Sequence, residues 1–222
     1  MIKDDSRHIS GVRCKICDEK CLPFFLVILA FWLGMSHLAW ADTLAVAIHD
    51  AHVRSNAVTA KYGTLPDLEL DDTLRTIWLK FNVSGFRAND NVTLTLIHSL
   101  GENGAYTAQV EALLADESSG FEWSEATITY NTQPTGSVSD VGADISVPSA
   151  LGAGGEVKVE FYLDEAYIQS DNTLTLKISA LSTGRVEYAS RENPNYAAPT
   201  LSQGGQTSYA VNPSPTDKAD MV

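Results

Sequence analysis

The chain of 222 residues carries 15 basic and 28 acidic side chains, and its formal net charge at pH 7 is −13. Such an acidic chain argues against nucleic acid or anionic membranes as partners, and it disfavours a polyanionic glycan unless basic side chains are locally concentrated. All three cysteines lie within the first 21 residues. The rest of the chain must therefore fold without disulfides, on an apolar core that a chain of this length can bury.

The N-terminal segment has the features of an export signal. An apolar run at 22–35 follows basic residues, and Ala39 and Ala41 are small residues where a signal peptidase would cleave before Asp42. The run is shorter than the roughly 20 apolar residues of a membrane span, and an uncleaved anchor is the alternative. We therefore predict a signal peptide at residues 1–41 and a secreted protein, with the periplasm as a second location.

The same segment contains Cys14, Cys17 and Cys21, whose spacing resembles half of a zinc site. A structural zinc site needs four ligands and no second pair follows. A leader, or a start codon assigned too early, explains these cysteines better. Removal of residues 1–41 would take five basic and four acidic residues away and leave a formal net charge of −14.

Beyond the leader, apolar and polar residues alternate in short segments, and no window of 11 or more residues has helical periodicity. In the clearest segment, residues 74–83, Ile77 and Leu79 point to one side, while Trp78 and Lys80 point to the other, which we expect to face solvent. Further strands are expected at 91–98, 105–114, 126–131, 144–147, 156–163, 172–181 and 186–190, and an opening strand is expected to pair with 200–203. Residues 162–170 are expected to add one helical turn.

Eight or more short strands separated by Gly, Asn, Asp and Ser clusters are typical of an all-β protein. We predict a two-sheet antiparallel β-sandwich with jelly-roll topology, because this arrangement leaves few exposed strand edges in a single domain. The domain is expected to span residues 42–203. Residues 204–222 are rich in Gln, Gly, Ser, Pro and Asp and are predicted to be a disordered tail or the stub of a linker.

Catalytic motifs are missing from the sequence. His49 and His52 stand three residues apart, so on a strand they point to opposite faces and cannot bind one metal. The sequence has no nucleophile elbow and no glycine-rich phosphate loop, and no cysteine follows the leader. We therefore predict that the protein is not an enzyme.

Several aspartates stand in expected loops, and carboxylate oxygens are the ligands that Ca²⁺ prefers. A structural Ca²⁺ is possible on this basis, although no spacing assigns a ligand and no other cofactor is predicted. These residues are Asp50, Asp67, Asp71, Asp72, Asp90 and Asp171.

Four stretches, taken in order, form a recognisable set: "DAHVRS" (50–55) with "KYGT" (61–64), "LRTIWLKFNVSG" (74–85), "FEWSEATITYNTQP" (121–134) and "VEYASRENPNYAAPTL" (186–201). Together they resemble the DNRLRE domain, also called carbohydrate-binding module family 96, over about residues 48–203. The resemblance implies a β-jelly-roll module that binds polysaccharide, with alginate-like uronates as the known type of ligand, usually attached to a lyase or another surface enzyme. The chain departs from the family pattern at Leu74, Asn82 and 130–132.

Uronate polymers present carboxylates and hydroxyls, which arginine forks, lysine charges and aromatic rings on a rigid sheet face would recognise. The predicted carbohydrate-binding residues are Arg54, Lys61, Tyr62, Arg75, Trp78 and Lys80. Acidic residues are interleaved with them, so a solvated face with balanced charges is the alternative.

A second group is predicted to be structural. Trp123 is expected to fill one end of the sandwich, and Glu125 is well placed to bridge to an arginine. Arg191 or Glu192 then clamps the closing strand to a neighbouring loop, because charge pairs at sheet ends commonly fix loop geometry.

Three functions remain open from the sequence. The first is a secreted, non-catalytic module that binds an acidic polysaccharide. The second is a structural or adhesive surface protein that uses the same sandwich for protein–protein contacts. The third is a polysaccharide-active enzyme, which the missing motifs disfavour. The oligomeric state is not predicted.

Overall fold

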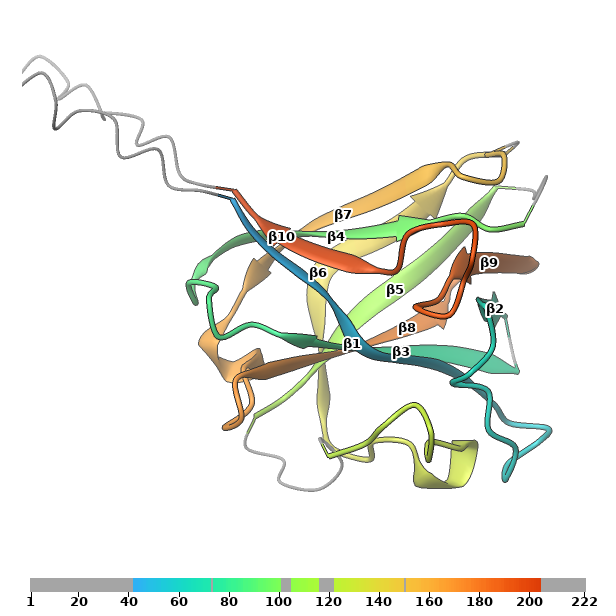
Figure 1. The fold of residues 1–222 in the computed structure, drawn as a ribbon, viewed down its shortest axis with the longest axis horizontal. Coiled ribbons are helices and arrows are strands. Elements are labelled where there is room, and N and C mark those ends of the chain that lie inside the picture. Colours follow the sequence, from blue (N-terminus) through green and yellow to red (C-terminus); the bar gives the residue numbers. More distant parts are fainter. Residues whose placement is uncertain (1–41, 73, 101–104, 116–121, 150, 205–222) are drawn as a thin grey trace, which may run out of the picture. The chain divides into compact units, whose positions relative to one another are not determined.

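The computed structural model describes residues 42–72, 74–100, 105–115, 122–149 and 151–204 (Figure 1). All of them belong to one compact unit, residues 41–222. The predicted signal peptide and all but the first residue of the predicted tail lie outside this part of the chain. No helix within it is long and apolar enough to cross a membrane.

Ten strands and two short 3-10 helices make up the regular structure of the described residues. The strands are β1 (Thr43–Arg54), β2 (Asp67–Asp71), β3 (Arg75–Asn82), β4 (Asp90–Ile97), β5 (Tyr106–Leu113), β6 (Val138–Val147), β7 (Glu156–Leu163), β8 (Thr173–Ala180), β9 (Arg185–Ala189) and β10 (Thr200–Gln203), and the 3-10 helices are η1 (Tyr130–Thr132) and η2 (Glu165–Tyr167). The predicted all-β class and the helical turn within 162–170 are therefore confirmed.

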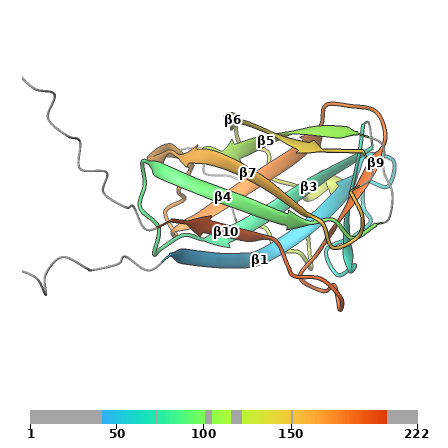
Figure 2. The ribbon, with the colours of Figure 1, turned by 90° about the horizontal axis from the view of Figure 1, so that it is seen from above.

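The strands form two antiparallel sheets of a β-sandwich, as predicted (Figures 1 and 2). One sheet has the order β6-β5-β8-β3-β1, with β2 and β9 attached beside β3, and the other has the order β1-β10-β4-β7. Strand β1 belongs to both sheets: its residues 43–46 pair with β10, and its residues 47–54 pair with β3. A register shift between Ala47 and His49 marks the change of partner.

Alternating side chains fill the space between the sheets. Along β7 every second residue is buried, and the buried residues face those of β4, so that Phe161 lies opposite Val92 and Val159 opposite Leu94. In the other sheet, β3 contributes Leu79, which is fully buried. Such cross-strand apolar pairs stabilise an antiparallel sheet and fix its register.

A second, smaller apolar cluster lies on the other side of β1 and β3. It consists of Ala51, Val53, Trp78, Trp123 and Ile128. Trp123 and Ile128 come from the 122–133 loop, which therefore covers the side of β3 that alternation predicted to be exposed.

The prediction of a strand at 126–131 is wrong, because these residues form turns and the start of η1. Side-chain hydroxyls explain the difference. The hydroxyl groups of Ser124 and Thr127 share a hydrogen bond of 2.9 Å, and the amide of Thr129 donates to Thr132 Oγ1 at 2.9 Å. Such local bonds satisfy backbone groups that a sheet would otherwise pair.

Strand β2 is absent from the sequence prediction. Its residues pair with β9, and Leu68 and Leu70 are buried while Glu69 between them points the opposite way. Its sequence, DLELD, alternates, but three carboxylates in five residues are typical of a solvated loop, so the segment is not recognised as a strand. This strand supplies two of the charged side chains described below.

Replacement of Leu79 by Ala should lower the free energy of unfolding by about 2–5 kcal/mol, because it removes buried methyl groups and leaves a cavity. The same change at Leu44, which is 64% exposed, should alter it by less than about 0.5 kcal/mol. Urea unfolding of the two variants measures the difference. Equal losses would mean that the sandwich core does not lie where this fold puts it.

Candidate functional site

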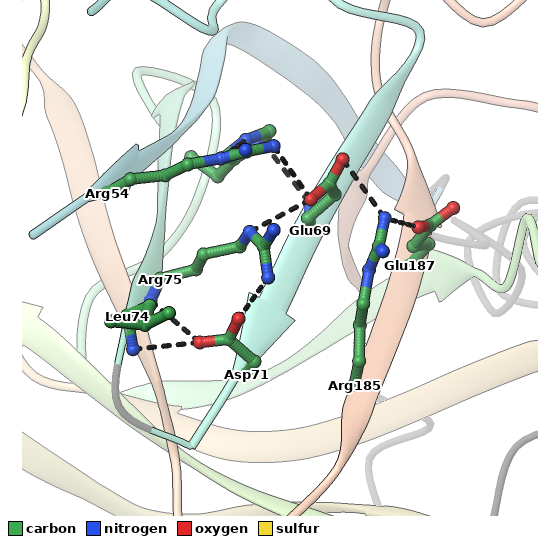
Figure 3. Close-up of polar contacts among 8 residues, drawn as sticks. Arg54, Glu69, Asp71, Leu74, Arg75, Arg185 and Glu187 are labelled. Atoms are coloured by element: carbon green, nitrogen blue, oxygen red, sulfur yellow. Dashed lines mark hydrogen bonds and ion pairs between the residues drawn. The ribbon is translucent and has the colours of Figure 1, made fainter. Parts of the chain in front are cut away.

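Six charged side chains from four strands meet near the C-terminal end of β1 (Figure 3). This arginine cluster comprises Arg54 of β1, Glu69 and Asp71 of β2, Arg75 of β3, and Arg185 and Glu187 of β9. Glu69 is its centre: its Oε2 atom accepts from Arg54 Nη2 at 2.8 Å and pairs with Arg75 Nε at 2.9 Å, and its Oε1 atom lies 3.1 Å from Arg185 Nη2. Three guanidinium groups and three carboxylates leave the cluster without net charge.

The remaining contacts of the cluster are those of Asp71 and of Arg185 with residues other than Glu69. Asp71 forms an ion pair with Arg75 and also accepts from the backbone amides of Leu74 and Arg75 at 2.8 and 3.0 Å. Arg185 forms an ion pair with Glu187. The side chain of Arg185 is 47% exposed, whereas that of Arg75 is 16% exposed. Arg185 is therefore the guanidinium of the cluster that solvent reaches most readily.

An aromatic ring lies against the cluster. Tyr62 stacks on His52 with the ring centroids 4.8 Å apart, and the guanidinium carbon of Arg54 lies 4.3 Å from the centre of the tyrosine ring. The amide of Glu69 donates to His52 Nδ1 at 3.2 Å, and Arg54 Nε lies 3.3 Å from His52 Nε2. Burial, followed by the charges of Arg54 and Arg75, lowers the pKa of His52 to about 3. A neutral imidazole thus supports a ring and a guanidinium that are both partly exposed.

A polar depression of about 150 Å³ adjoins the cluster through Asp71 and Arg75. A second aspartate, Asp72, and the half-exposed ring of Tyr130 also line it. The complete lining is Ser55, Asp71, Asp72, Leu74, Arg75, Thr76, Tyr130, Ser179 and Ala180. Carboxylates, hydroxyls and a ring in one shallow space can form hydrogen bonds with the hydroxyl groups of a sugar.

Of the six predicted carbohydrate-binding residues, the structure brings Arg54, Tyr62 and Arg75 together and leaves Lys61 exposed beside Tyr62. The expectation that Trp78 and Lys80 face solvent is wrong: they are 2% and 5% exposed. The 122–133 loop covers this side of β3, where Trp78 Nε1 donates to Gln133 Oε1. Lys80 Nζ lies 3.8 Å from a carboxylate of Asp171.

The predicted carbohydrate-binding residues did not include five residues of this region: His52, Glu69, Asp71, Arg185 and Glu187. The available signal was weak. Glu69 and Asp71 have the period-2 spacing of a strand, but their acidic neighbours make the segment look like a solvated loop. Nothing in the sequence relates Arg185 to Glu69, because their contact depends on the pairing of β2 with β9.

The predicted clamp residues lie in a second group, the Arg191 clamp, formed by Asp50, Trp123, Glu125, Arg191 and Glu192. Arg191 Nη1 contacts Glu125 Oε2 at 3.0 Å and the carbonyl oxygen of Ile48, and the Arg191 amide donates to Asp50 Oδ2 at 2.9 Å. The chain after β9 is thereby tied to β1 and to the 122–133 loop. Trp123 is 6% exposed and its Nε1 atom donates to Thr175 Oγ1.

A close backbone approach joins the two groups. A Cβ atom added at Gly63 would lie 2.2 Å from the carbonyl oxygen of Glu125, so only glycine fits there. The loop that carries Tyr62 therefore lies directly against the segment that carries Glu125.

The sequence profile of carbohydrate-binding module family 96 matches residues 42–203. The chain belongs to this family. A search of curated proteins finds no match. Among solved structures, the chain is similar to the N-terminal endo-1,4-β-D-xylanase 10B of Clostridium thermocellum, a CBM22-1–GH10 structure complexed with xylohexaose, at 12% identity and a TM-score of 0.36. The similarity covers 77% of this chain and 30% of the xylanase chain, so this protein spans less than a third of that structure.

In the folded chain, the motifs that resemble family 96 contribute residues to the arginine cluster and to the Arg191 clamp. The segments 50–55, 61–64 and 74–85 supply Arg54, Tyr62 and Arg75 of the region around the arginine cluster. The segments 121–134 and 186–201 supply Trp123, Glu125, Arg191 and Glu192 of the Arg191 clamp, whereas its Asp50 comes from segment 50–55 and Glu187 of the arginine cluster comes from segment 186–201. Arg54 and Tyr62 of the first set are thus partly exposed at a surface, whereas the Arg191 clamp joins β1, the 122–133 loop and the chain after β9.

Replacement of Glu69 by Gln should lower the free energy of unfolding by about 1–3 kcal/mol, because three guanidinium groups lose their shared carboxylate. Urea denaturation at pH 7 provides the measurement. The matched control is Glu160→Gln on the exposed face of β7, which should change the value by less than about 0.5 kcal/mol. If the two variants are equally stable, the arginine cluster does not stabilise the fold.

Replacement of Arg191 by Ala should lower the Tm by about 2–4 °C, because a loop loses contacts with β1 and Glu125 worth roughly 1 kcal/mol. Lys158→Ala, which removes an exposed ion pair with Glu156, should leave the Tm nearly unchanged. Differential scanning calorimetry measures both variants. An unchanged Tm together with lost polysaccharide binding would assign Arg191 to the ligand site instead.

Proposed function

We propose that this family 96 module is a secreted, non-catalytic protein that binds a polysaccharide containing uronate residues, and that it does so at the surface formed by Arg54, Lys61, Tyr62 and Arg185. The observation that carries the proposal is the stack of Tyr62 with His52 and Arg54, held by Glu69 and partly open to solvent. Export is supported by the apolar segment 22–35 with small residues before Asp42.

The physical argument begins with rigidity. Arg54 and Tyr62 are fixed by contacts within the protein, so ordering them on binding costs little conformational entropy. An aromatic ring offers apolar area to the C–H groups of a sugar, while a neighbouring guanidinium offers paired donors to hydroxyl or carboxylate oxygens. A ring beside an arginine on a firm sheet end is therefore suited to a carbohydrate chain.

Two exposed basic side chains support a uronate ligand. Lys61 lies at the surface beside Tyr62, and Arg185 is 47% exposed at the other side of Glu69. A sugar carboxylate could pair with either cation without displacing Glu69. Guanidinium–carboxylate contacts are among the stronger hydrogen bonds that a surface can form.

A neutral polysaccharide is the second candidate, and one observation favours it. The depression next to the cluster contains Asp71 and Asp72, which would repel a uronate but accept hydrogen bonds from sugar hydroxyls. The strongly acidic chain adds to this repulsion at low salt. Preference for a uronate would therefore indicate binding beside Lys61 and Arg185, and preference for a neutral glucan would indicate binding in the depression.

A binding panel with alginate, pectin and neutral glucans tests the function, and Tyr62→Ala tests the site. The substitution should weaken binding at least tenfold, equivalent to about 1.4 kcal/mol, because the platform for the sugar is lost. Tyr162→Ala provides the matched control, since Tyr162 is a half-exposed tyrosine on β7, outside the cluster. Affinity electrophoresis and calorimetry measure the change.

Four outcomes would contradict all or part of the proposal. Failure to bind any polymer would remove polysaccharide binding and favour protein–protein contacts. Equal losses in the two tyrosine variants would move the site elsewhere. Release of new reducing ends or unsaturated uronates from the polymers would show that the protein is an enzyme. Preference for neutral glucans would show that the ligand is a neutral polysaccharide, the second candidate, and not a uronate polymer.

A further inference from the structure

Three carboxylates meet within the Arg191 clamp, from segments far apart in the sequence. Asp50 lies on β1, Glu125 in the 122–133 loop and Glu192 after β9, and one oxygen atom of each lies within 4.8 Å of the others. These residues lie outside the arginine cluster. Carboxylates this close repel one another unless a proton or a cation stands between them.

Asp50 provides the second, independent observation. Its side chain is fully buried, and its Oδ2 atom accepts from the Arg191 amide at 2.9 Å. Its Oδ1 atom is also buried, yet it has no hydrogen-bond partner among the described residues. A buried carboxylate oxygen without a hydrogen-bond partner is unfavourable and usually has an explanation in the structure.

The neighbouring cations do not balance the three carboxylates. Arg191 contacts Glu125, and its guanidinium supplies one positive charge. His49 Nδ1 lies 3.8 Å from Glu125 Oε2. The guanidinium of Arg191 contacts Glu125 and not Asp50 Oδ1, which has no hydrogen-bond partner among the described residues.

We propose that Asp50, Glu125 and Glu192 bind a calcium ion, with Asp50 Oδ1 as the buried ligand. Ca²⁺ takes six to eight oxygen ligands at about 2.3–2.6 Å in irregular geometry, so oxygens up to about 5 Å apart can share one ion. The carboxylates of this group satisfy that limit. Mg²⁺ requires near-octahedral geometry at about 2.0–2.1 Å and fits three carboxylates from a strand and two loops less well. Water completes the coordination on the exposed side of Glu192.

The ion would connect β1, the 122–133 loop and the chain after β9, which Arg191 already joins by hydrogen bonds. It would also hold Glu125, whose backbone supports Gly63 and hence the loop of Tyr62. Its role is structural, and it does not depend on which polysaccharide the protein binds.

Isothermal titration calorimetry of the full chain with CaCl₂, after treatment with a chelator, tests the site without any polysaccharide. Cys14, Cys17 and Cys21 do not interfere, because thiolates prefer softer metals. We expect one ion per chain, and a Tm that rises by about 5–10 °C at a free calcium concentration near one hundred times Kd. Asp50→Asn and Glu192→Gln should each weaken binding at least tenfold.

Asp144→Asn is the matched control, because it removes one negative charge from an exposed position on β6 and should bind calcium like the parent chain. If Asp50→Asn does not fold, Glu192→Gln decides, since its side chain is exposed. Absence of binding at millimolar CaCl₂ would overturn the proposal. Parent-like affinity in both ligand variants would also overturn it, because the ion would then bind elsewhere.

Discussion

The double pairing of β1 is the constraint on which the rest of the structure depends. Its first four residues complete one sheet beside β10, and the residues after the register shift at Ala47 complete the other sheet beside β3. Residues 50–53 of the strand are buried on both sides, and this part of the strand carries Asp50, His52 and Arg54 at alternate positions. Each of these three side chains anchors a different contact: Asp50 receives the Arg191 amide, His52 supports Tyr62, and Arg54 reaches Glu69. A strand paired in only one sheet would lose the buried environment that makes these contacts specific.

If the proposed site is correct, the arginine cluster shows how a group of charges without net charge would serve as a recognition surface. Glu69 holds Arg54, Arg75 and Arg185 from three strands, so the guanidinium groups are oriented before any ligand arrives. This preorganisation lowers the entropy lost on binding, but it also means that Glu69 competes with an acidic ligand for the same donors. Only a cation with an exposed part, such as Arg185, can bind a ligand carboxylate and keep its ion pair with Glu69. The exposed cations at the edge of the cluster, such as Arg185, would therefore determine which ligand charge is preferred, whereas Glu69 at its centre stabilises the fold.

The sequence predicted the fold well where burial alternates on one side of a strand, and it failed where a loop covers the other side. The alternation in β7 corresponds to a strand with one buried face, and its predicted limits agree with the structure. In β3, the same reasoning assigned Trp78 and Lys80 to solvent, because alternation separates two faces but contains no information about a distant loop packing on one of them. Strand β2 shows the opposite error: Glu69 and Asp71 look solvated in the sequence, but they pair with arginines of β1, β3 and β9 that only tertiary pairing brings near. Site residues whose partners come from adjoining strands were thus the least predictable.

The contact of Gly63 with Glu125 makes the two charged groups parts of one mechanical unit. Because a Cβ atom has no room there, the loop of Tyr62 and the 122–133 loop pack directly against each other. The position of Glu125 is in turn fixed by Arg191 and, in our proposal, by a bound ion. A calcium ion that favours this arrangement of the 122–133 loop would also favour the proposed binding orientation of Tyr62, and thermodynamic linkage would require the reverse effect to be equal in size. The two loops are also joined by a hydrogen bond from the Asn131 amide to the Val58 carbonyl oxygen at 3.1 Å, so this coupling would need no change of fold.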